Sequence, residues 1–478
     1  MHPPSVRTLY RAGLPAIACA GLLSFVPRAA LAACPPRPTN PDTSSQSYSY
    51  QGAPVAGAEG ERCIVWYATS GPQAPDLTAQ TPPTPDVVRR AVEVVDDALQ
   101  RYVEQGFRAV PGDGGSAECA GNIDDRLDVY LVAFAAADGL TVPEACTGSP
   151  PRCTSFVVAE RAPEKRGYAS FDEGARTILP HEVFHAVQNA YDVEIDRYWS
   201  EGSAQWATWN LHPDLLDLAH FAPKFLAELD RPLDLPPGGV TASFLYGSAL
   251  WPVFLAQRHG PGVILEVMGA HGDKHQPSFE AVTSALGAHG ATLPDEFALF
   301  SAWNAATGQR AAAGQGYARA VDYGTAPLSP DAPEGILAGF SARLHQASLP
   351  AGSQLTLAAD PERVSASWLP LSDGRADLAG LVSLPATVAG DGVVVVSGRS
   401  SKKSDAAYRV DVTASPAPTA TTTAPAPSAT APPSASTSPP PTPSAPGATP
   451  PLAVDDPGSS TASGGVAPGA DGVGGGEV

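Results

Sequence analysis

The motif His-Glu-Val-Phe-His at residues 181–185 combines side chains that could hold a metal ion and use it. On a helix, residues at i and i+4 lie on the same face, so His181 and His185 can direct two ring nitrogens at one ion. Imidazole nitrogens bind zinc at about 2.0–2.1 Å. Glu182 would lie beside that ion, where a carboxylate can accept a proton from water. The motif therefore predicts a catalytic zinc site.

A third protein ligand is expected further along the chain. Catalytic zinc sites use three protein ligands and keep the fourth position open. Glu201 is the acid that we expect to complete the set. Asp192, Glu194 and Asp196 are its rivals for this position. If the helix continues past His185, Asp192 would lie about two turns beyond it, too far for a short side chain.

The motif also lies in a segment with the apolar periodicity of a helix. Asp172 and Glu173 suit the acidic first turn of a helix that begins near Phe171. The alternative interpretation is a surface helix that carries two unrelated histidines and a solvated glutamate.

The composition divides the chain into segments. We expect an α+β fold in which a small sheet is followed by a mostly helical lobe carrying the zinc motif, with a small β-sandwich after it. The expected ranges are a signal peptide at 1–32, a linker at 33–61, the sheet-containing part of the catalytic unit at 62–160, its helical zinc-binding part at 161–325, the β-sandwich at 338–413 and a disordered tail at 414–478.

Hydrophobic periodicity predicts individual elements within these ranges. Strands are expected at 63–68, 127–134, 155–159, 393–398 and 408–413. Helical segments are expected at 86–103, from 171 through the zinc motif, around Glu201, and at 244–259, 263–268, 279–286 and 295–306.

The N-terminus has the pattern of a secretion signal. Two arginines precede an apolar run at residues 12–26 that is too short to cross a membrane. Small residues at 30–32 predict cleavage before Ala33. Residues 31–34 also resemble a lipobox, in which Cys34 would carry a lipid anchor. We expect plain secretion, with an outer-membrane lipoprotein as the alternative.

The cysteine count bears on the same question. Of the six cysteines, Cys19 would leave with the signal, so five would remain. Acylation of Cys34 would leave four, enough for two disulfides in an oxidising compartment. Cys146 and Cys153 flank a proline-rich turn, and we expect them to form a bridge.

Composition also narrows the range of partners. The net charge of −20 is spread along the chain, which argues against nucleic acid or an anionic membrane as a partner. The tail from about residue 415 is rich in Pro, Ala, Ser and Thr and has too few large apolar residues to fold. We therefore expect no nucleic-acid partner and no transmembrane span, and a peptide or protein substrate is what the family resemblance described next implies.

Two segments together resemble the gluzincin clan of zinc peptidases, namely the zinc motif with the three residues after it (181–188) and the segment Trp-Ser-Glu-Gly-Ser-Ala-Gln-Trp at 199–206. More narrowly, the chain is similar to a family of secreted metalloproteases of myxobacteria. This resemblance extends from about Cys63 to Thr413, including Leu-Asp-Val-Tyr-Leu at 127–131. The range 338–413 resembles the bacterial pre-peptidase C-terminal domain.

The resemblance implies a zincin-like catalytic domain and a role for each matching residue. His181, His185 and Glu201 match the zinc ligands, and Glu182 matches the general base for a zinc-activated water that hydrolyses peptide bonds. Tyr246 resembles the tyrosine that stabilises the oxyanion in related peptidases. Its alternative role is that of a packed aromatic near the start of a helix.

Two features depart from the clan. Only fifteen residues separate His185 from Glu201, so the connection must be tight. Gln205 occupies a position where relatives often place an acid that orients a ligand histidine, and a glutamine could still accept a hydrogen bond from imidazole. His259 is a poorer candidate for stabilising the oxyanion, because a histidine before Gly260 is typical of a helix C-terminus.

The residues at fixed distances from the zinc motif also distinguish this chain from other classes of zinc peptidase. The third histidine that a metzincin places six residues after His185 is replaced by Tyr191. The Gly-x-Met-Glu-Asn segment of gluzincin aminopeptidases is missing, which favours an endopeptidase. The main alternative is a secreted surface or adhesion protein that uses a peptidase scaffold without catalysis, and a zinc hydrolase of other substrates is a third possibility.

Overall fold

The computed structural model of the chain describes residues 35–40, 48–78, 80–81, 84–112, 124–134, 137–235 and 242–413. Within these residues the fold is of the mixed α+β class that the sequence predicts. The expected signal peptide, Cys34, Cys119 and the expected tail from residue 414 lie outside the described residues. The part that is described contains no helix that is both long and apolar enough to cross a membrane.

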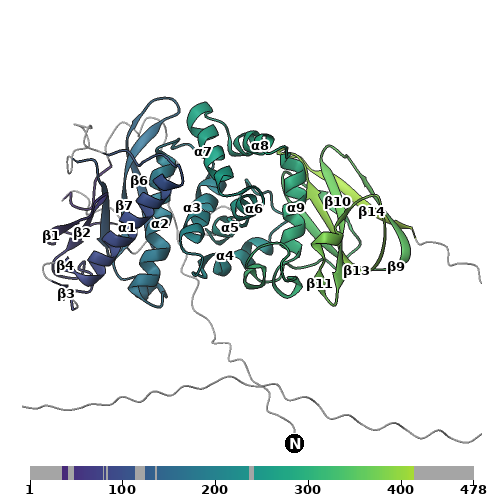
Figure 1. The fold of residues 1–478 in the computed structure, drawn as a ribbon, viewed down its shortest axis with the longest axis horizontal. Helices are drawn as coiled ribbons and strands as arrows, with labels where there is room; N and C mark the ends of the chain where they lie inside the picture. Colours follow the sequence, from purple (N-terminus) through teal and green to yellow (C-terminus); the bar gives the residue numbers. More distant parts are fainter. Residues whose placement is uncertain are drawn as a thin grey trace, which may run out of the picture. The chain divides into compact units, whose positions relative to one another are not determined.

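The first sheet has five strands in the order β1-β2-β5-β7-β6 (Figure 1). These strands are β1 (Val55–Glu59), β2 (Cys63–Ala68), β5 (Leu127–Val132), β6 (Gly139–Thr147) and β7 (Arg152–Glu160). β2, β5 and β7 run parallel, whereas β1 and β6 pair antiparallel with their neighbours at the two edges. A separate pair is formed by β3 (Gln80–Thr81) and β4 (Thr84–Pro85). The edge strand β6 becomes important below, because it borders the candidate site.

Helices α1 (Asp86–Glu104) and α2 (Phe171–Asn189) cover one face of this sheet (Figure 1). Alternate residues of the central strands face these helices, among them Val65, Val129 and Val157. The opposite face carries a second apolar cluster that includes Tyr130 and Phe156. The sheet is therefore buried on both faces, which explains why its central strands are apolar without alternation.

The N-terminal segment covers the second face of the sheet, so the described residues of the expected linker, 35–40 and 48–61, belong to the folded core. It contains strand β1, and the side chains of Tyr48 and Tyr50 are buried against the sheet. Arg37 is 6% exposed, and its guanidinium pairs with Asp128 and lies 2.7–2.8 Å from both carboxylate oxygens of Glu144. The polar and glycine-rich composition of this segment did not predict that it packs on the sheet, because the partners of Arg37 lie about 90–107 residues away in the sequence.

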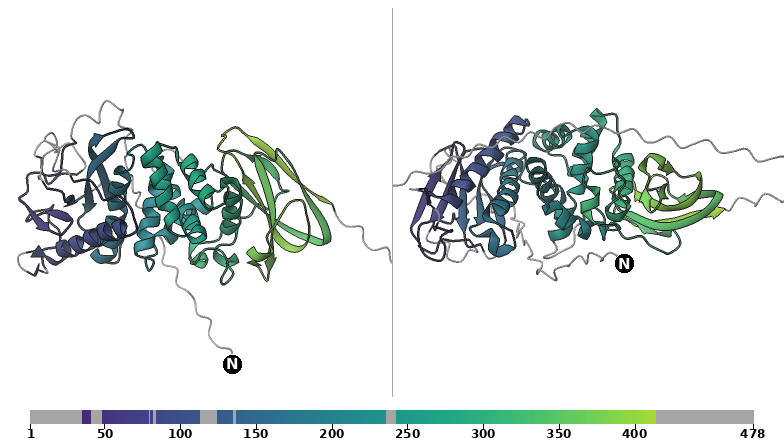
Figure 2. Two further views of the ribbon diagram at one scale, coloured as in Figure 1. Left: turned by 45° about the horizontal axis from the view of Figure 1, so that its top comes forward. Right: turned by 60° about the horizontal axis from the view of Figure 1, so that its bottom comes forward.

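A helical lobe follows the first sheet and lies between it and a second sheet (Figure 2). Its helices are α3 (Arg197–Leu211), α4 (Asp217–Leu226), α5 (Ala242–Gly247), α6 (Leu250–His259), α7 (Gly262–Lys274), α8 (Ser278–Ala288) and α9 (Leu293–Ala305). Helix α4 was not expected from the sequence, whereas segments at all the other positions were.

The second sheet has seven strands, and it is a single sheet rather than two separate ones. Its strands are β8 (Glu334–Leu337), β9 (Ala342–Ala359), β10 (Val364–Ser372), β11 (Arg375–Ala376), β12 (Val382–Ser383), β13 (Ala386–Gly398) and β14 (Ala406–Thr413). This sheet spans the range of the expected β-sandwich at 338–413, and its long strands β9 and β13 stay paired along most of their length. One face of the sheet packs on α9, where the rings of Phe297 and Phe340 lie 5.1 Å apart.

The Arg37 ion pairs give a stability prediction. We expect Arg37→Ala to lower the free energy of unfolding by about 3–5 kcal/mol, because it leaves two buried carboxylates without their cation. Urea unfolding followed by circular dichroism measures the difference. Arg89→Ala is the control, since Arg89 makes only exposed ion pairs with Asp86 and Glu93, and it should change stability little. Equal midpoints for Arg37→Ala and the parent would contradict the prediction.

Candidate metal centre

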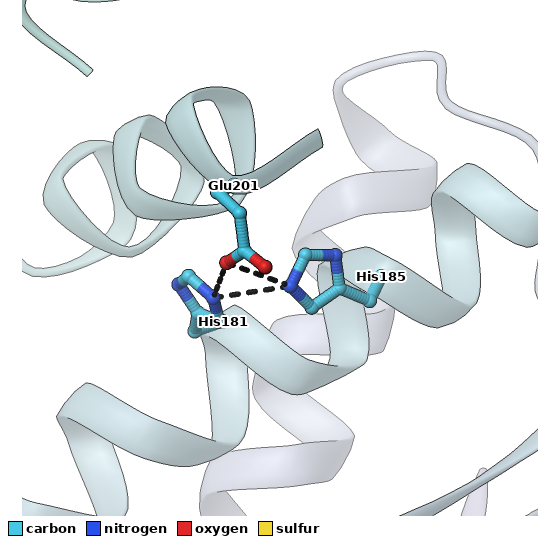
Figure 3. A group of neighbouring side chains, drawn as sticks. All are labelled: His181, His185 and Glu201. Atoms are coloured by element: carbon cyan, nitrogen blue, oxygen red, sulfur yellow. Dashed lines mark hydrogen bonds and ion pairs between the residues drawn. The ribbon is translucent and has the colours of Figure 1, made fainter. Parts of the chain in front are cut away.

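Helix α2 presents the two histidines of the motif on one face (Figure 3). The helix begins at Phe171, as expected, and Ser170 caps it by accepting a hydrogen bond from the Glu173 amide at 3.1 Å. Most of its later residues are buried against the sheet, α1 and α3. Packing on several sides fixes the rotation of α2, and this directs His181 and His185 toward α3.

Helix α3 supplies Glu201, whose carboxylate points at both imidazoles (Figure 3). The Nε2 atoms of His181 and His185 lie 3.1 Å apart. Glu201 Oε2 lies 3.4 Å from the first of these nitrogens and 3.6 Å from the second. The structure thus brings together the three residues that the sequence predicts as ligands, and among the described residues this is the one group of three or more such side chains close enough to hold a metal ion.

The dimensions of this triangle suit a metal ion. Ligand atoms about 2.0–2.2 Å from a tetrahedral zinc ion lie about 3.3–3.6 Å from one another. The three observed separations of 3.1, 3.4 and 3.6 Å fall near that range. Glu201 Oε2 is also fully buried and accepts no well-formed hydrogen bond within the described part of the chain. A buried carboxylate oxygen without a donor is costly, and a cation at the centre of the triangle would satisfy it.

The protonation states of His185 and Glu201 in the metal-free site follow from the short distance between them. Burial alone would lower the pKa of His185, but the neighbouring Glu201 carboxylate outweighs it and raises that pKa to about 9. Burial alone would raise the pKa of Glu201, but the two imidazoles outweigh it and hold that pKa well below its usual range. Glu201 is therefore ionised across the physiological range, and a proton on His185 takes the place of a cation.

Glu182 lies against the edge strand β6. Thr141 Oγ1 lies 2.9 Å from Glu182 Oε2 and 2.7 Å from the backbone oxygen of the same residue. A Cβ atom at position 139 would lie only 2.6 Å from Glu182 Oε1, so Gly139 is needed for this approach. Burial raises the pKa of Glu182, opposed by the imidazoles of His185 and His181.

The sequence did not predict the residues that surround His185. Its Nδ1 atom lies 2.7 Å from Gln188 Oε1, and Ser200 Oγ lies 2.8 Å from that same oxygen. Gln188 is 2% exposed. Its spacing from His185, three residues along the helix, was available as a signal, since i and i+3 share a face.

The three rivals for the third ligand position make other contacts. Helix α2 ends at Asn189, so these residues occupy the loop before α3. Asp192 and Glu194 both lie beside the imidazole of His275. Asp196 accepts a hydrogen bond from the Ser278 amide at 2.7 Å. The tight connection therefore places Glu201, not its rivals, at the histidines.

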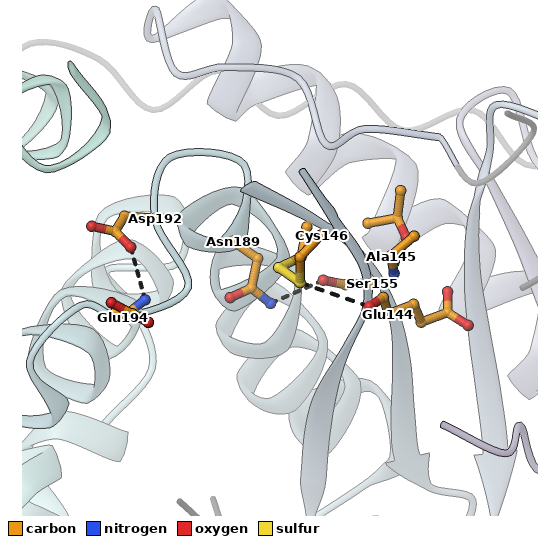
Figure 4. The surroundings of a disulfide bond; sticks show 9 residues. Glu144, Ala145, Cys146, Ser155, Asn189, Asp192 and Glu194 are labelled. Carbon is orange, nitrogen blue, oxygen red and sulfur yellow. Dashed lines mark hydrogen bonds between the residues drawn. A yellow bond between two sulfur atoms is a disulfide. The ribbon is translucent and has the colours of Figure 1, made fainter. Parts of the chain in front are cut away.

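A disulfide supports the end of α2 (Figure 4). Cys146 and Cys153 are bonded, as predicted, across the hairpin of β6 and β7. Next to this bond, Asn189 Nδ2 donates a hydrogen bond to Ser155 Oγ at 2.9 Å. The same hairpin carries Thr141, so the strand that contacts Glu182 is held at its far end by the bridge.

Two further candidates occupy the opposite wall. Tyr246 on α5 is half-buried, and its ring lies 5.4 Å from that of His181. Gln205 donates a hydrogen bond to Asp217 of the unexpected helix α4, instead of contacting an imidazole as a replacement for the acid of relatives. Burial raises the pKa of Asp217, opposed by Gln205 and by His181. Asp217 is therefore a carboxyl group, from a different element, that interacts electrostatically with His181.

His259 lies away from the site, as expected for a helix C-terminal residue. It ends α6 before Gly260, whose φ is +87°, and its Nε2 lies 3.4 Å from Glu296 Oε2.

No model of a known protein family matches the sequence, and no curated protein matches it. The functional interpretation therefore depends on the geometry and chemistry of the site itself.

The charge of the metal-free site predicts a pH dependence of metal binding. Below about pH 9, His185 carries a proton that a metal ion must displace, so zinc affinity should rise about tenfold per pH unit between pH 6.5 and 8.5. Competition with a chromophoric chelator, corrected for the chelator's own protonation, measures this slope. A zinc affinity that is independent of pH would contradict the assignment of that proton.

Proposed function

We propose that this chain is a zinc-dependent metallopeptidase, acting as an endopeptidase, with a catalytic unit of the zincin type formed by the first sheet and the helical lobe. The observation that carries the proposal is the triangle of His181 Nε2, His185 Nε2 and Glu201 Oε2 next to the buried Glu182. A set of two imidazoles and one carboxylate is typical of catalytic zinc in peptidases. A purely structural zinc site has no chemical use for Glu182.

We further propose that the protein is exported. The Cys146–Cys153 bridge supports this, because disulfides persist mainly in oxidising compartments. The expected signal peptide at 1–32 agrees with it, whether Cys34 is lipidated or not.

Zinc held by the three ligands would supply Lewis acidity and acidify water. The residues around it would then have distinct tasks. His181 and Glu201 are buried and His185 is partly buried, and the three carry one formal negative charge between them when both imidazoles are neutral, so a divalent ion would keep one net positive charge. Exclusion of water around them strengthens their electrostatic interaction with a substrate.

Glu182 would accept a proton from the attacking water and later pass it to the departing amine. The contacts of Thr141 suit both protonation states. When Glu182 is ionised, the hydroxyl can donate to Oε2. When Glu182 is protonated, Oε2 can donate to the hydroxyl, whose own proton then goes to the Glu182 backbone oxygen at 2.7 Å. Thr141 would therefore orient the carboxyl group in either state without a change of position.

Tyr246 would donate a hydrogen bond to the oxyanion that forms during hydrolysis. Its support is its position on α5, where its ring lies 5.4 Å from that of His181. The ring is held by Phe221, 4.9 Å away, so it has a wall to pack on at the rim of the site.

The roles of Glu182 and Glu201 can be separated by substitution. We expect Glu182→Gln to retain about one zinc ion per chain and to lose peptide hydrolysis by at least about 10²–10⁴-fold, because a general base is removed while the ligands stay. Glu201→Ala should lose zinc affinity itself. Zinc content by mass spectrometry and cleavage of a quenched peptide, with and without chelator, measure both effects.

Undiminished hydrolysis by Glu182→Gln would contradict the mechanism. Zinc binding without chelator-sensitive cleavage by the parent protein would instead favour the non-catalytic scaffold. Glu296→Gln is a suitable control, since Glu296 is a buried carboxylate paired with Arg258 far from the zinc ligands.

Tyr246 is tested by removal of its hydroxyl. Tyr246→Phe should lower kcat about 10²-fold or more with little change in KM, because the hydrogen bond is formed only in the transition state. Steady-state kinetics on the quenched peptide checks this. If kcat and KM are both unchanged, Tyr246 is a packed aromatic and another donor stabilises the oxyanion.

A further inference from the structure

The side chain of Gln188 joins the two helices that carry the metal ligands. It lies on α2, one turn after His185, and reaches α3 next to Glu201. Its amide makes four contacts, which is the full capacity of a primary amide. Oε1 lies 2.7 Å from His185 Nδ1 and 2.8 Å from Ser200 Oγ, while Nε2 lies 2.8 Å from the Ser200 carbonyl oxygen and 2.9 Å from Ser203 Oγ.

The orientation of this amide follows from its surroundings. The backbone oxygen of Ser200 can only accept a hydrogen bond, so the NH2 group of Gln188 must face it. Ser203 Oγ donates its proton to the Trp199 carbonyl oxygen at 2.7 Å, so it too must accept from Gln188. Two independent acceptors on α3 therefore exclude the flipped amide.

This orientation decides the tautomer of His185. With NH2 facing α3, Gln188 Oε1 faces His185 Nδ1 and can only accept a hydrogen bond from it. Nδ1 must then carry a proton, which leaves the lone pair of a neutral imidazole on Nε2. Nε2 is the atom that faces His181 and Glu201. The opposite tautomer would place a proton between the ligands.

The same contacts set the position of Glu201. Ser200 precedes Glu201 directly, and both its backbone oxygen and its hydroxyl are bound to Gln188. Sliding α3 along α2 would break these bonds in a partly buried place, where an unpaired polar group is costly. Gln188 therefore also holds the register of the two helices.

We propose that Gln188 is a positioning residue of the metal centre, which selects Nε2 of His185 as the metal ligand and fixes Glu201 opposite it. This inference rests on the zinc site of the proposed function and deepens it. It assigns to one buried amide, which touches neither substrate nor metal, the alignment of two ligands from two helices.

Zinc affinity of the full chain tests this inference without reference to peptidase activity. Gln188→Met keeps the size of the side chain but removes all four contacts, and we expect about 10- to 100-fold weaker zinc binding. Gln188→Glu keeps an acceptor for His185 Nδ1, so it should lose less zinc affinity than Gln188→Met. Asn189→Leu is the matched control, because Asn189 is the next residue on α2 and bonds to Ser155, not to a ligand. It should bind zinc like the parent.

Equal zinc affinity of Gln188→Met and the parent, or equal losses in Gln188→Met and Asn189→Leu, would overturn the inference. A parent chain that binds no zinc would overturn the proposed function as well, so the two failures are distinguishable. A measurement on the parent alone needs no variant to fold. In protein with ¹⁵N-labelled histidine loaded with ¹¹³Cd, we expect scalar coupling of the metal to Nε2 of His185, and coupling to Nδ1 instead would overturn the inference.

Discussion

The structure depends on the close approach of three polar groups, two of them buried and one partly buried, at one point between α2 and α3. Two imidazoles and a carboxylate are held within 3.6 Å of one another, and no described residue donates a well-formed hydrogen bond to Glu201 Oε2. Such an arrangement loses hydration without full compensation inside the protein. In the metal-free form, the raised pKa of His185 shows how the fold responds, since a proton supplies the missing positive charge. A divalent ion would supply it more completely, and its binding free energy would then add to the stability of the fold.

The position of this centre depends on tertiary contacts with elements that precede and follow the zinc motif in the sequence. The first sheet packs against α2, and its edge strand β6 brings Gly139 and Thr141 to Glu182. That strand is held at one end by the disulfide, while Arg37 ties the N-terminal segment to Glu144 in its middle. On the opposite wall, α4 and α5 contribute Asp217 and Tyr246. The site is therefore the meeting point of elements from across 35–247, and its precision follows from their packing rather than from the motif alone.

The parts that could be predicted from sequence are those with a local signal. The spacing of His181 and His185 and the start of α2 at Phe171 depend on helix periodicity and capping, and the structure agrees with both. Glu201 was the expected third ligand although Asp192, Glu194 and Asp196 were rivals in the same short connection, and the structure places Glu201 at the histidines. Arg37 and Asp217 could not be identified, because their roles depend on partners brought close only by the fold. The same reason explains the linker that became part of the sheet and the helix α4 that was missed.

Gln188 shows where these two kinds of residue meet. Its place on the ligand-bearing face of α2 can be derived from its position three residues after His185, but its orientation cannot, because the decisive acceptors belong to α3. A local pattern can thus indicate which side chains share a face, whereas only the packed pair of helices determines which atom of each side chain is directed at the centre. For a metal site, where a change from one imidazole nitrogen to the other replaces a ligand by a proton, this second level of order is the one that matters for chemistry.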